Sequence, residues 1–344
     1  MKIAIAQRLR PFSHRPGVYV PLPKASCLLR VFPTRIEWES EGKKQSITIG
    51  LTGPVDDFTV QLDLEKESIL IFGRAKEGYF RLVLRAEEKG IRLLVEKAFA
   101  EGILIDEKRL FPKQDLFYSV PFSFSSSQEW ERLSLGGHKK QDVDELIKQD
   151  FLKELLPLFY ALSQKMPELE GEKVGSATLL GTHLSSFCKA AFFDLLSPRL
   201  FDDQYQGLCP LEGKEKNPFF LFSEFKHWIR SLFFIEKEKE ITLLPSTSFD
   251  AGRMVGVKAS SVGRIDFEWC SFRLRRAVIH SSTKEPFFLK TAFPFHSFRV
   301  SELGSVEKKR HLIKEPLFLK EGKRYLLDQF HEDKKIEDRD VSLR

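Results

Sequence analysis

The chain has 344 residues, of which 42% are hydrophobic and 30% are charged, and its 55 basic and 49 acidic residues give a net charge of +6. This composition is ordinary for a soluble globular protein, and the length exceeds what one hydrophobic core usually supports, so we expect two or three structural units. The basic excess lies in runs of mixed sign, such as residues 236–240 and 331–340, whereas nucleic-acid binding usually gathers basic residues on one face. Nucleic acid is therefore not the expected partner, and binding of an anionic polymer is the weakest hypothesis.

The cysteine spacing shows whether a metal site is expected, and the hydropathy shows whether a signal peptide or a membrane span is expected. The four cysteines, Cys27, Cys188, Cys209 and Cys270, are far apart and form no C-x-x-C pair. Two disulfides are the alternative, but we expect four free thiols and no metal site. The apolar run at residues 3–6 is too short for a signal peptide, and no run reaches the roughly 18 apolar residues that span a bilayer. We expect a cytoplasmic protein with no cofactor and no membrane partner.

Residues 1–125 have the pattern of an N-terminal β-sandwich. Short stretches of alternating apolar and polar residues, such as Cys27–Phe32 and Phe58–Leu64, recur about every 8–12 residues with glycine or proline between them, which favours antiparallel strands over βαβ units. The sequence Glu87–Gly90 predicts a hairpin turn with its glycine in the left-handed conformation. The small and polar segment 119–127 is then expected to be a linker.

The hydrophobic period changes in residues 126–238, which we expect to form a reduced helical region. Apolar residues recur at steps of three and four in Asp142–Tyr160, Ala177–Leu196 and Pro218–Ile235, as on one face of a helix. Pro157 is expected to kink the first of these helices or to begin a second one.

Strand-like alternation returns in residues 239–335, the expected C-terminal β-sandwich-like domain. A short apolar strand at Ile241–Leu244 precedes a turn at Gly252–Gly256 and two strands at Arg264–Trp269 and Leu274–His280. No internal repeat is evident. The expected fold class is therefore multidomain α and β, with a helical region between two β-domains.

The last apolar helix and the stretch Glu240–His280 form the only part of the chain whose sequence pattern is typical of a known family. The positions that carry it are Ile241, Leu243, Leu244, Pro245, Phe249, Gly252, Val255, Gly256, Val257, Ala259, Gly263, Asp266, Trp269, Leu274, Ala277 and Ile279. In this order they resemble the junction between the catalytic helical barrel and the C-terminal β-domain of inverting α-L-fucosidases, which are six-hairpin glycosidases. The resemblance implies a carbohydrate-related protein with a shortened barrel, which binds glycans and has lost or altered its hydrolase activity.

Inverting glycoside hydrolysis needs a carboxylic acid and a carboxylate base roughly 6.5–9.5 Å apart, with a water between them. The candidates for catalytic roles are His138, Asp142, Asp202, Asp203 and Glu224. The first two follow a glycine pair, the next two lie in a polar and aromatic loop, and Glu224 lies on an apolar helix beside aromatic surface that suits a general acid. Each also has a structural interpretation, namely helix capping, turn formation or the polar side of an amphipathic helix.

Several enzyme classes are excluded by missing motifs, because the chain has no GxGxxG, P-loop, nucleophile-elbow or zinc-ligand pattern. In the β-domain, alternation along Arg264–Trp269 predicts that Asp266 and Glu268 point away from the core. The alternative function is a non-catalytic protein–protein interaction module in which two β-domains and a helical spacer present surfaces. The expected partner is thus an oligosaccharide or another protein.

Overall fold

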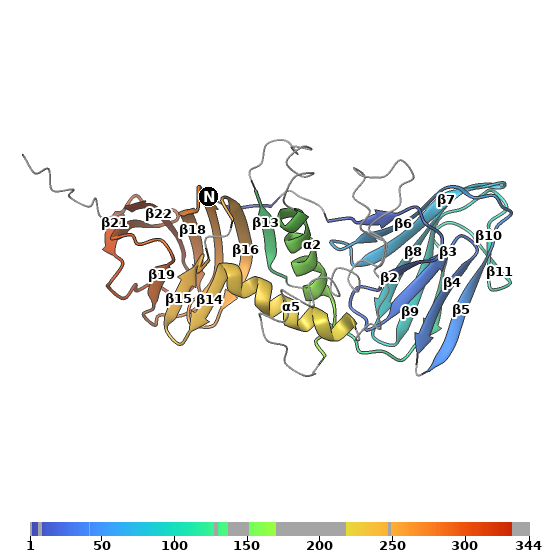
Figure 1. Cartoon of the computed structure of the whole chain (residues 1–344), viewed down its shortest axis with the longest axis horizontal. Helices are drawn as coiled ribbons and strands as arrows, with labels where there is room; N and C mark the ends of the chain where they lie inside the picture. The colour runs from blue at the N-terminus through green and yellow to red at the C-terminus, as the bar shows by residue number, and fades with distance from the viewer. Residues whose placement is uncertain are drawn as a thin grey trace, which may run out of the picture.

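The structure, a computed structural model, describes residues 2–5, 9–40, 42–126, 130–136, 151–169, 218–246 and 249–331. This part of the chain is mostly β, with several antiparallel sheets and two helices (Figure 1). The expectation of a β-rich chain is therefore confirmed. Neither of the two described helices is both long and apolar enough to cross a membrane.

Two six-stranded antiparallel sheets make up the N-terminal part. The first has the order β1 (Phe12–Ser13), β6 (Asp56–Asp63), β7 (Ser68–Ala75), β8 (Gly78–Glu87), β9 (Gly90–Lys97) and β12 (Asp115–Ser119). The second has the order β11 (Lys108–Leu110), β10 (Ile103–Ile105), β5 (Lys43–Gly50), β4 (Arg35–Ser40), β3 (Leu28–Phe32) and β2 (Val18–Pro21). Their inward side chains, such as Leu29 and Val31, belong to one hydrophobic core that both sheets share.

One local expectation for the N-terminal part is wrong in detail. Gly90 has no left-handed φ; glycine is needed there because a Cβ would lie 1.9 Å from the carbonyl oxygen of Tyr118. The segment expected to be a linker contacts the N-terminal part where it is described, since Phe124 forms a β-bridge with Ala25 and the N–H of Ser125 donates to the carbonyl of Lys24 at 2.8 Å.

Helices α2 (Phe151–Lys165) and α5 (Pro218–Phe233) pack against each other between the N-terminal and C-terminal sheets (Figure 1). Helix α2 continues through Pro157, so this proline neither ends nor begins a helix. Helix α5 confirms the predicted helix Pro218–Ile235, except that the last two predicted residues, Phe234 and Ile235, begin a strand. The start of the first predicted helix and all of Ala177–Leu196 lie outside the described residues.

Sequence periodicity explains the burial of α5. Its fully or nearly fully buried side chains recur at steps of three and four: Phe222, Phe225, Ile229 and Phe233.

The C-terminal part contains a seven-stranded sheet and a three-stranded sheet. The seven-stranded sheet has the order β13 (Arg132–Leu135), β16 (Gly252–Ala259), β17 (Gly263–Cys270), β18 (Arg273–Ser281), β22 (Arg324–His331), β20 (Ser297–Glu302) and β21 (Lys308–Leu312). The smaller sheet has the order β14 (Phe234–Lys237), β15 (Glu240–Leu243) and β19 (Phe288–Thr291), and β15 pairs with β19 in parallel.

The stretch that carries the family resemblance consists of strands, with two corrections. Gly252–Gly256 lies within strand β16, and Gly256 marks a β-bulge at φ +82° where a turn was expected. Asp266 lies on the face opposite Ile265 and Phe267, as expected, but it is buried there, and its Oδ1 accepts a hydrogen bond of 2.7 Å from the N–H of Gly256 at this bulge. Glu268 is half-buried and pairs with Arg276.

Segments far apart in the sequence share the C-terminal sheet. Strand β13 comes from the region expected to be helical and pairs with β16. The N-terminus lies against the same sheet (Figure 1), where Ile3 packs with Val255 and Val278. The guanidinium of Arg253 donates to the carbonyl of Ala4 at 3.0 Å. The first residues therefore bind to the sheet formed by the last third of the chain.

Candidate functional site

The structure describes one of the five predicted catalytic residues. His138, Asp142, Asp202 and Asp203 lie outside the described residues. Glu224 lies half-buried on α5, and its carboxylate has no hydrogen bond or ion pair within the described part of the chain. The catalytic roles of all five residues therefore remain predictions.

A concave pocket of about 600 Å³ lies on the outer face of the second N-terminal sheet. We call it the β2–β5 pocket, because strands β2, β3, β4 and β5 supply most of its lining, with Phe219 of α5 at its border. Its size is within the range of roughly 300–1,000 Å³ that is common for small-molecule sites. It is the largest of the pockets described in this structure.

One cross-strand row runs across this pocket. Tyr19 on β2 lies opposite Arg30 on β3, which lies opposite Glu37 on β4, which lies opposite Ser46 on β5. The row faces outward because the intervening residues of each strand, such as Val20 and Leu29, face the core. Hydrophobic alternation thus positions four polar or aromatic side chains side by side.

Arg30 is held in this row by aromatic rings. Its guanidinium carbon lies 5.4 Å from the ring centroid of Tyr19 and 4.9 Å from that of Phe32. Within the described residues no carboxylate pairs with it, whereas the neighbouring Arg35 forms an ion pair of 2.7 Å with Glu37. These contacts therefore restrict the Arg30 side chain while its N–H donors remain available to a ligand.

The chemistry of the β2–β5 pocket suits a neutral ligand that has both C–H faces and hydroxyl groups. Tyr19, which is 37% exposed, adds an aromatic ring to the lining, and aromatic rings suit C–H contact. Arg30 offers a planar fork of donors, and Gln45, which also lines the pocket, offers an amide donor and acceptor. These residues were not predicted from the sequence, although the alternation in β2 and β3 identifies Tyr19 and Arg30 as outward-facing.

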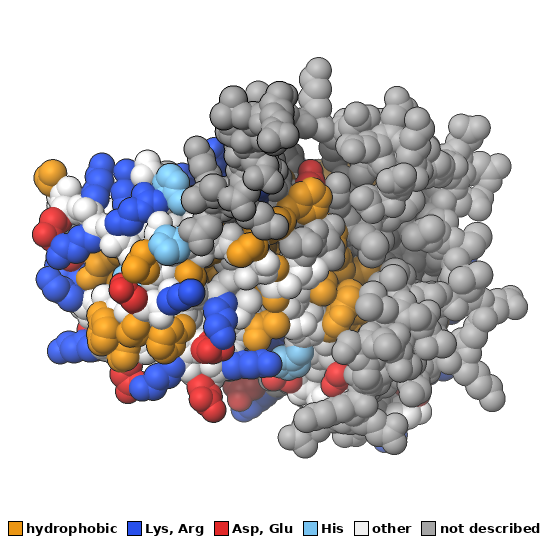
Figure 2. Space-filling view, turned by 60° about the vertical axis from the view of Figure 1, so that its left-hand side comes forward, with side chains coloured by type: hydrophobic (Ala, Val, Ile, Leu, Met, Phe, Trp, Pro, Cys, Tyr) orange, Lys and Arg blue, Asp and Glu red, His pale blue; other side chains and the backbone are white. Residues whose placement is uncertain are grey.

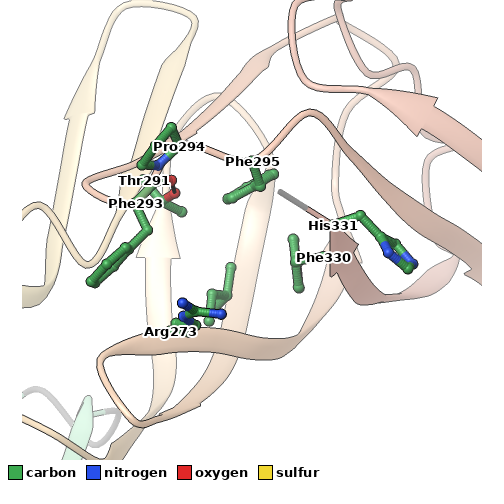
Figure 3. A pocket seen from close by; sticks show the side chains of 8 residues that line it. Arg273, Thr291, Phe293, Pro294, Phe295, Phe330 and His331 are labelled. Carbon is green, nitrogen blue, oxygen red and sulfur yellow. Dashed lines mark hydrogen bonds between the residues drawn. The ribbon is translucent and has the colours of Figure 1, made fainter. Parts of the chain in front are cut away.

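A second pocket, of about 180 Å³, lies in the C-terminal part (Figure 3). Phe295 and Phe330 line it together with Arg273, and Phe293 and His331 lie at its borders. The rings of Phe295 and Phe330 contact each other edge to face, with 4.9 Å between centroids. Its volume is below that of typical ligand sites, so we interpret it as an incompletely filled aromatic core.

A cluster of ionisable groups around Glu131 joins α2, α5 and β16. The carboxylate accepts hydrogen bonds from the hydroxyl of Tyr160, from Nε of Arg230 at 3.1 Å and from the N–H of Lys258 at 3.0 Å. Burial, followed by the nearby carboxylate, raises the pKa of Tyr160 well above its ordinary value. Because these groups are mutually satisfied, we interpret the cluster as a structural junction and not as a reactive site.

Among the described residues, no group of three or more histidines, cysteines, aspartates or glutamates could hold a metal ion. A scan against protein-family models finds no match for the chain, and a search of curated proteins finds no similar sequence.

Proposed function

We propose that this chain binds an oligosaccharide in the β2–β5 pocket. In this proposal the N-terminal sheets form a β-sandwich, and the C-terminal part forms a β-sandwich-like domain. The region between them is a reduced form of the six-hairpin glycosidase barrel, and its hydrolase activity is lost or altered. The binding step needs only the row Tyr19, Arg30, Glu37 and Ser46. No hydrolytic step is part of the proposal.

The observation that supports it best is the stacked arginine. A guanidinium that contacts two aromatic rings, without a carboxylate partner in the described part of the chain, keeps its N–H donors at the pocket surface. Adjacent hydroxyls of a sugar ring accept hydrogen bonds from such donors, while the C–H face of the ring packs on the aromatic ring of Tyr19. Little side-chain entropy is then lost on binding, which favours recognition by a small site.

A protein ligand is the second candidate, in keeping with a non-catalytic interaction module. Charges of both signs border the pocket, since Glu39 and Lys44 lie opposite each other on β4 and β5 and both are exposed. Such a polar rim around an aromatic centre is also typical of protein interfaces.

A glycan screen of the full chain, followed by calorimetric titration of the glycans found, tests the proposal. Arg30→Ala and Tyr19→Ala are each expected to weaken binding about tenfold or more, since charged hydrogen bonds contribute roughly 1.5–3 kcal/mol and aromatic contacts somewhat less. Tyr79→Ala is the matched control, because Tyr79 is 39% exposed and also contacts a cation, Lys97, but lies on the other N-terminal sheet. Unchanged affinity in Arg30→Ala would overturn the assignment of the pocket.

Incubation with aryl-glycosides separates binding from hydrolysis. Glycan binding without turnover is the expected result. If the full chain neither binds any glycan nor turns over any aryl-glycoside, the carbohydrate proposal fails and the protein-interaction module becomes the better account.

A further inference from the structure

Two seven-residue segments of the C-terminal part are nearly identical in sequence. Residues 284–290 read Lys-Glu-Pro-Phe-Phe-Leu-Lys, and residues 314–320 read Lys-Glu-Pro-Leu-Phe-Leu-Lys. They differ only at Phe287 and Leu317. The expectation that the chain has no internal repeat is therefore wrong at this short length.

The structure places the two segments beside each other in antiparallel orientation. Phe287 and Leu317 form a β-bridge in which the N–H of each donates to the carbonyl of the other, at 3.2 and 2.8 Å. Because the bridge joins equivalent positions of antiparallel segments, an approximate local two-fold axis relates the repeats.

Equivalent positions in the repeats are buried and exposed alike. The first and third apolar residues after each proline are buried: Phe287, Leu289, Leu317 and Leu319. The residue between them points to the opposite side, and there Phe288 is 37% exposed and Phe318 is 66% exposed. The two exposed phenylalanines thus lie on one face, as diagonal neighbours across the bridge.

The two repeats contain four lysines and two glutamates, of which Glu315 is exposed and has no ion pair among the described residues. Lys290 pairs with Glu240 at 2.7 Å, and Glu285 pairs with Lys239 at 3.2 Å. The ammonium groups at the remaining lysine positions of the repeats have no ion-pair partner among the described residues: Lys284, Lys314 and Lys320. We call Phe288, Phe318 and these three lysines the KEP patch.

We propose that the KEP patch docks the protein reversibly on an anionic lipid surface. Its charge is complementary to anionic headgroups, and each exposed lysine near such a surface adds to the attraction. Its phenylalanines can enter the interfacial layer of the bilayer while the lysine stems extend along it and keep their ammonium groups in water. This peripheral contact needs no spanning segment and is independent of the proposed carbohydrate binding.

A second copy of the chain fits the patch less well. The exposed parts of the two phenylalanine rings amount to roughly 200 Å², whereas a stable interface buries roughly 800 Å² on each partner. Two copies would also bring like charges together. A partner peptide would need a pocket for Phe318, which protrudes, whereas a fluid bilayer surface accommodates a protruding ring without a preformed shape.

The position of the patch allows a flat surface to approach it. Strand β19 lies at the end of the elongated molecule that is remote from the N-terminal sheets (Figure 1). Figure 2, in which this end is turned toward the viewer, shows hydrophobic side chains gathered at the surface among basic and acidic ones. The β2–β5 pocket, at the other part of the molecule, would remain accessible during docking.

Co-sedimentation of the full chain with vesicles tests the proposal. The chain is expected to sediment with vesicles of phosphatidylcholine and phosphatidylserine and not with phosphatidylcholine alone, and added salt should release it. The double variant Phe288→Ser/Phe318→Ser should lose about tenfold or more of the partition coefficient, because it removes most of the apolar contact. Replacing the three lysines by glutamine should weaken binding and remove most of its salt dependence.

Phe111→Ser is the matched control, since Phe111 is 43% exposed but lies in the N-terminal part, and it should bind vesicles as the unchanged chain does. Phe318→Trp should show a blue shift of its fluorescence on the anionic vesicles. No sedimentation at low ionic strength, or equal sedimentation of the double serine variant, would overturn the proposal. Loss of a dimer in that variant, without vesicle binding by the unchanged chain, would assign the patch to self-association instead.

Discussion

The carboxylate of Glu131 is expected to be a major determinant of how firmly the helices are attached to the sheets. Its side chain is 13% exposed and binds Tyr160 of α2, Arg230 of α5 and the N–H of Lys258 in β16. The substitution Glu131→Gln keeps the shape of the side chain but replaces one acceptor oxygen by a donor. A donor would then face other donors, and Arg230 would lose its ionic partner.

The expected loss of stability follows from the burial of the ion pair between Glu131 and Arg230. Removing one partner of a buried ion pair costs about 3–5 kcal/mol. The cost here is smaller, because Arg230 is 25% exposed, also donates to the carbonyl of Lys258 and stacks on Phe234 at 4.4 Å. We expect Glu131→Gln to lower the free energy of unfolding by about 2–3 kcal/mol.

Urea denaturation followed by circular dichroism measures this free energy, and the midpoint should fall while the slope stays unchanged. The control is Glu96→Gln, because Glu96 pairs with Arg81 at 2.7 Å but is 44% exposed. Exposed pairs contribute less than about 1 kcal/mol, so the control should remain close to the unchanged chain. A loss below about 0.5 kcal/mol in Glu131→Gln would show that the junction is held by apolar packing alone.

Three further results are expected. Alkylation at about pH 8 should modify the exposed Cys270 and spare Cys27, whose thiol is buried and has its pKa raised by burial to about 12, as peptide mass mapping would show. Burial raises the pKa of Glu67, but hydrogen bonds from two lysines outweigh it and hold this pKa below its ordinary value of 4.5. Glu67→Gln should therefore be less stable than the unchanged chain at neutral pH, and the difference should shrink as the pH falls below 4.5; a difference independent of pH would contradict this reasoning. Ile3→Ala should lower the free energy of unfolding by about 2 kcal/mol or more in the same urea assay, because Ile3 is fully buried against the C-terminal sheet, and an unchanged midpoint would show that the N-terminal contact does not form.

Features that depend on neighbouring residues could be predicted from the sequence. The strands at β3, β6 and β17 follow from alternation, and α5 follows from apolar residues at steps of three and four. The prediction of a turn at Gly252–Gly256 was wrong because glycine occurs both in turns and where close packing leaves no room for a side chain. A Cβ at Gly252 would lie 2.4 Å from the ring of Trp269, so glycine is needed there for close packing within a strand.

Features that depend on distant residues could not be predicted. Nothing local indicates that β13 pairs with β16, or that Ile3 packs on Val278. The candidate site also depends on residues that are distant in the sequence. Alternation could have shown that Tyr19 and Arg30 face outward, but only the register between strands places them opposite each other. The five catalytic candidates chosen from their local sequence context remain predictions.

Helix α5 relates the two proposed binding surfaces to each other. Its 16 residues span about 24 Å. Phe219 in its first turn lines the β2–β5 pocket. The last residue of α5 leads directly into β14, whose sheet contains β19 and thus Phe288 of the KEP patch. Because Glu131 binds Arg230 in the last turn of α5, this one carboxylate holds the element that connects both surfaces. Glu131→Gln should therefore loosen the attachment of α5 without touching a residue of either proposed site.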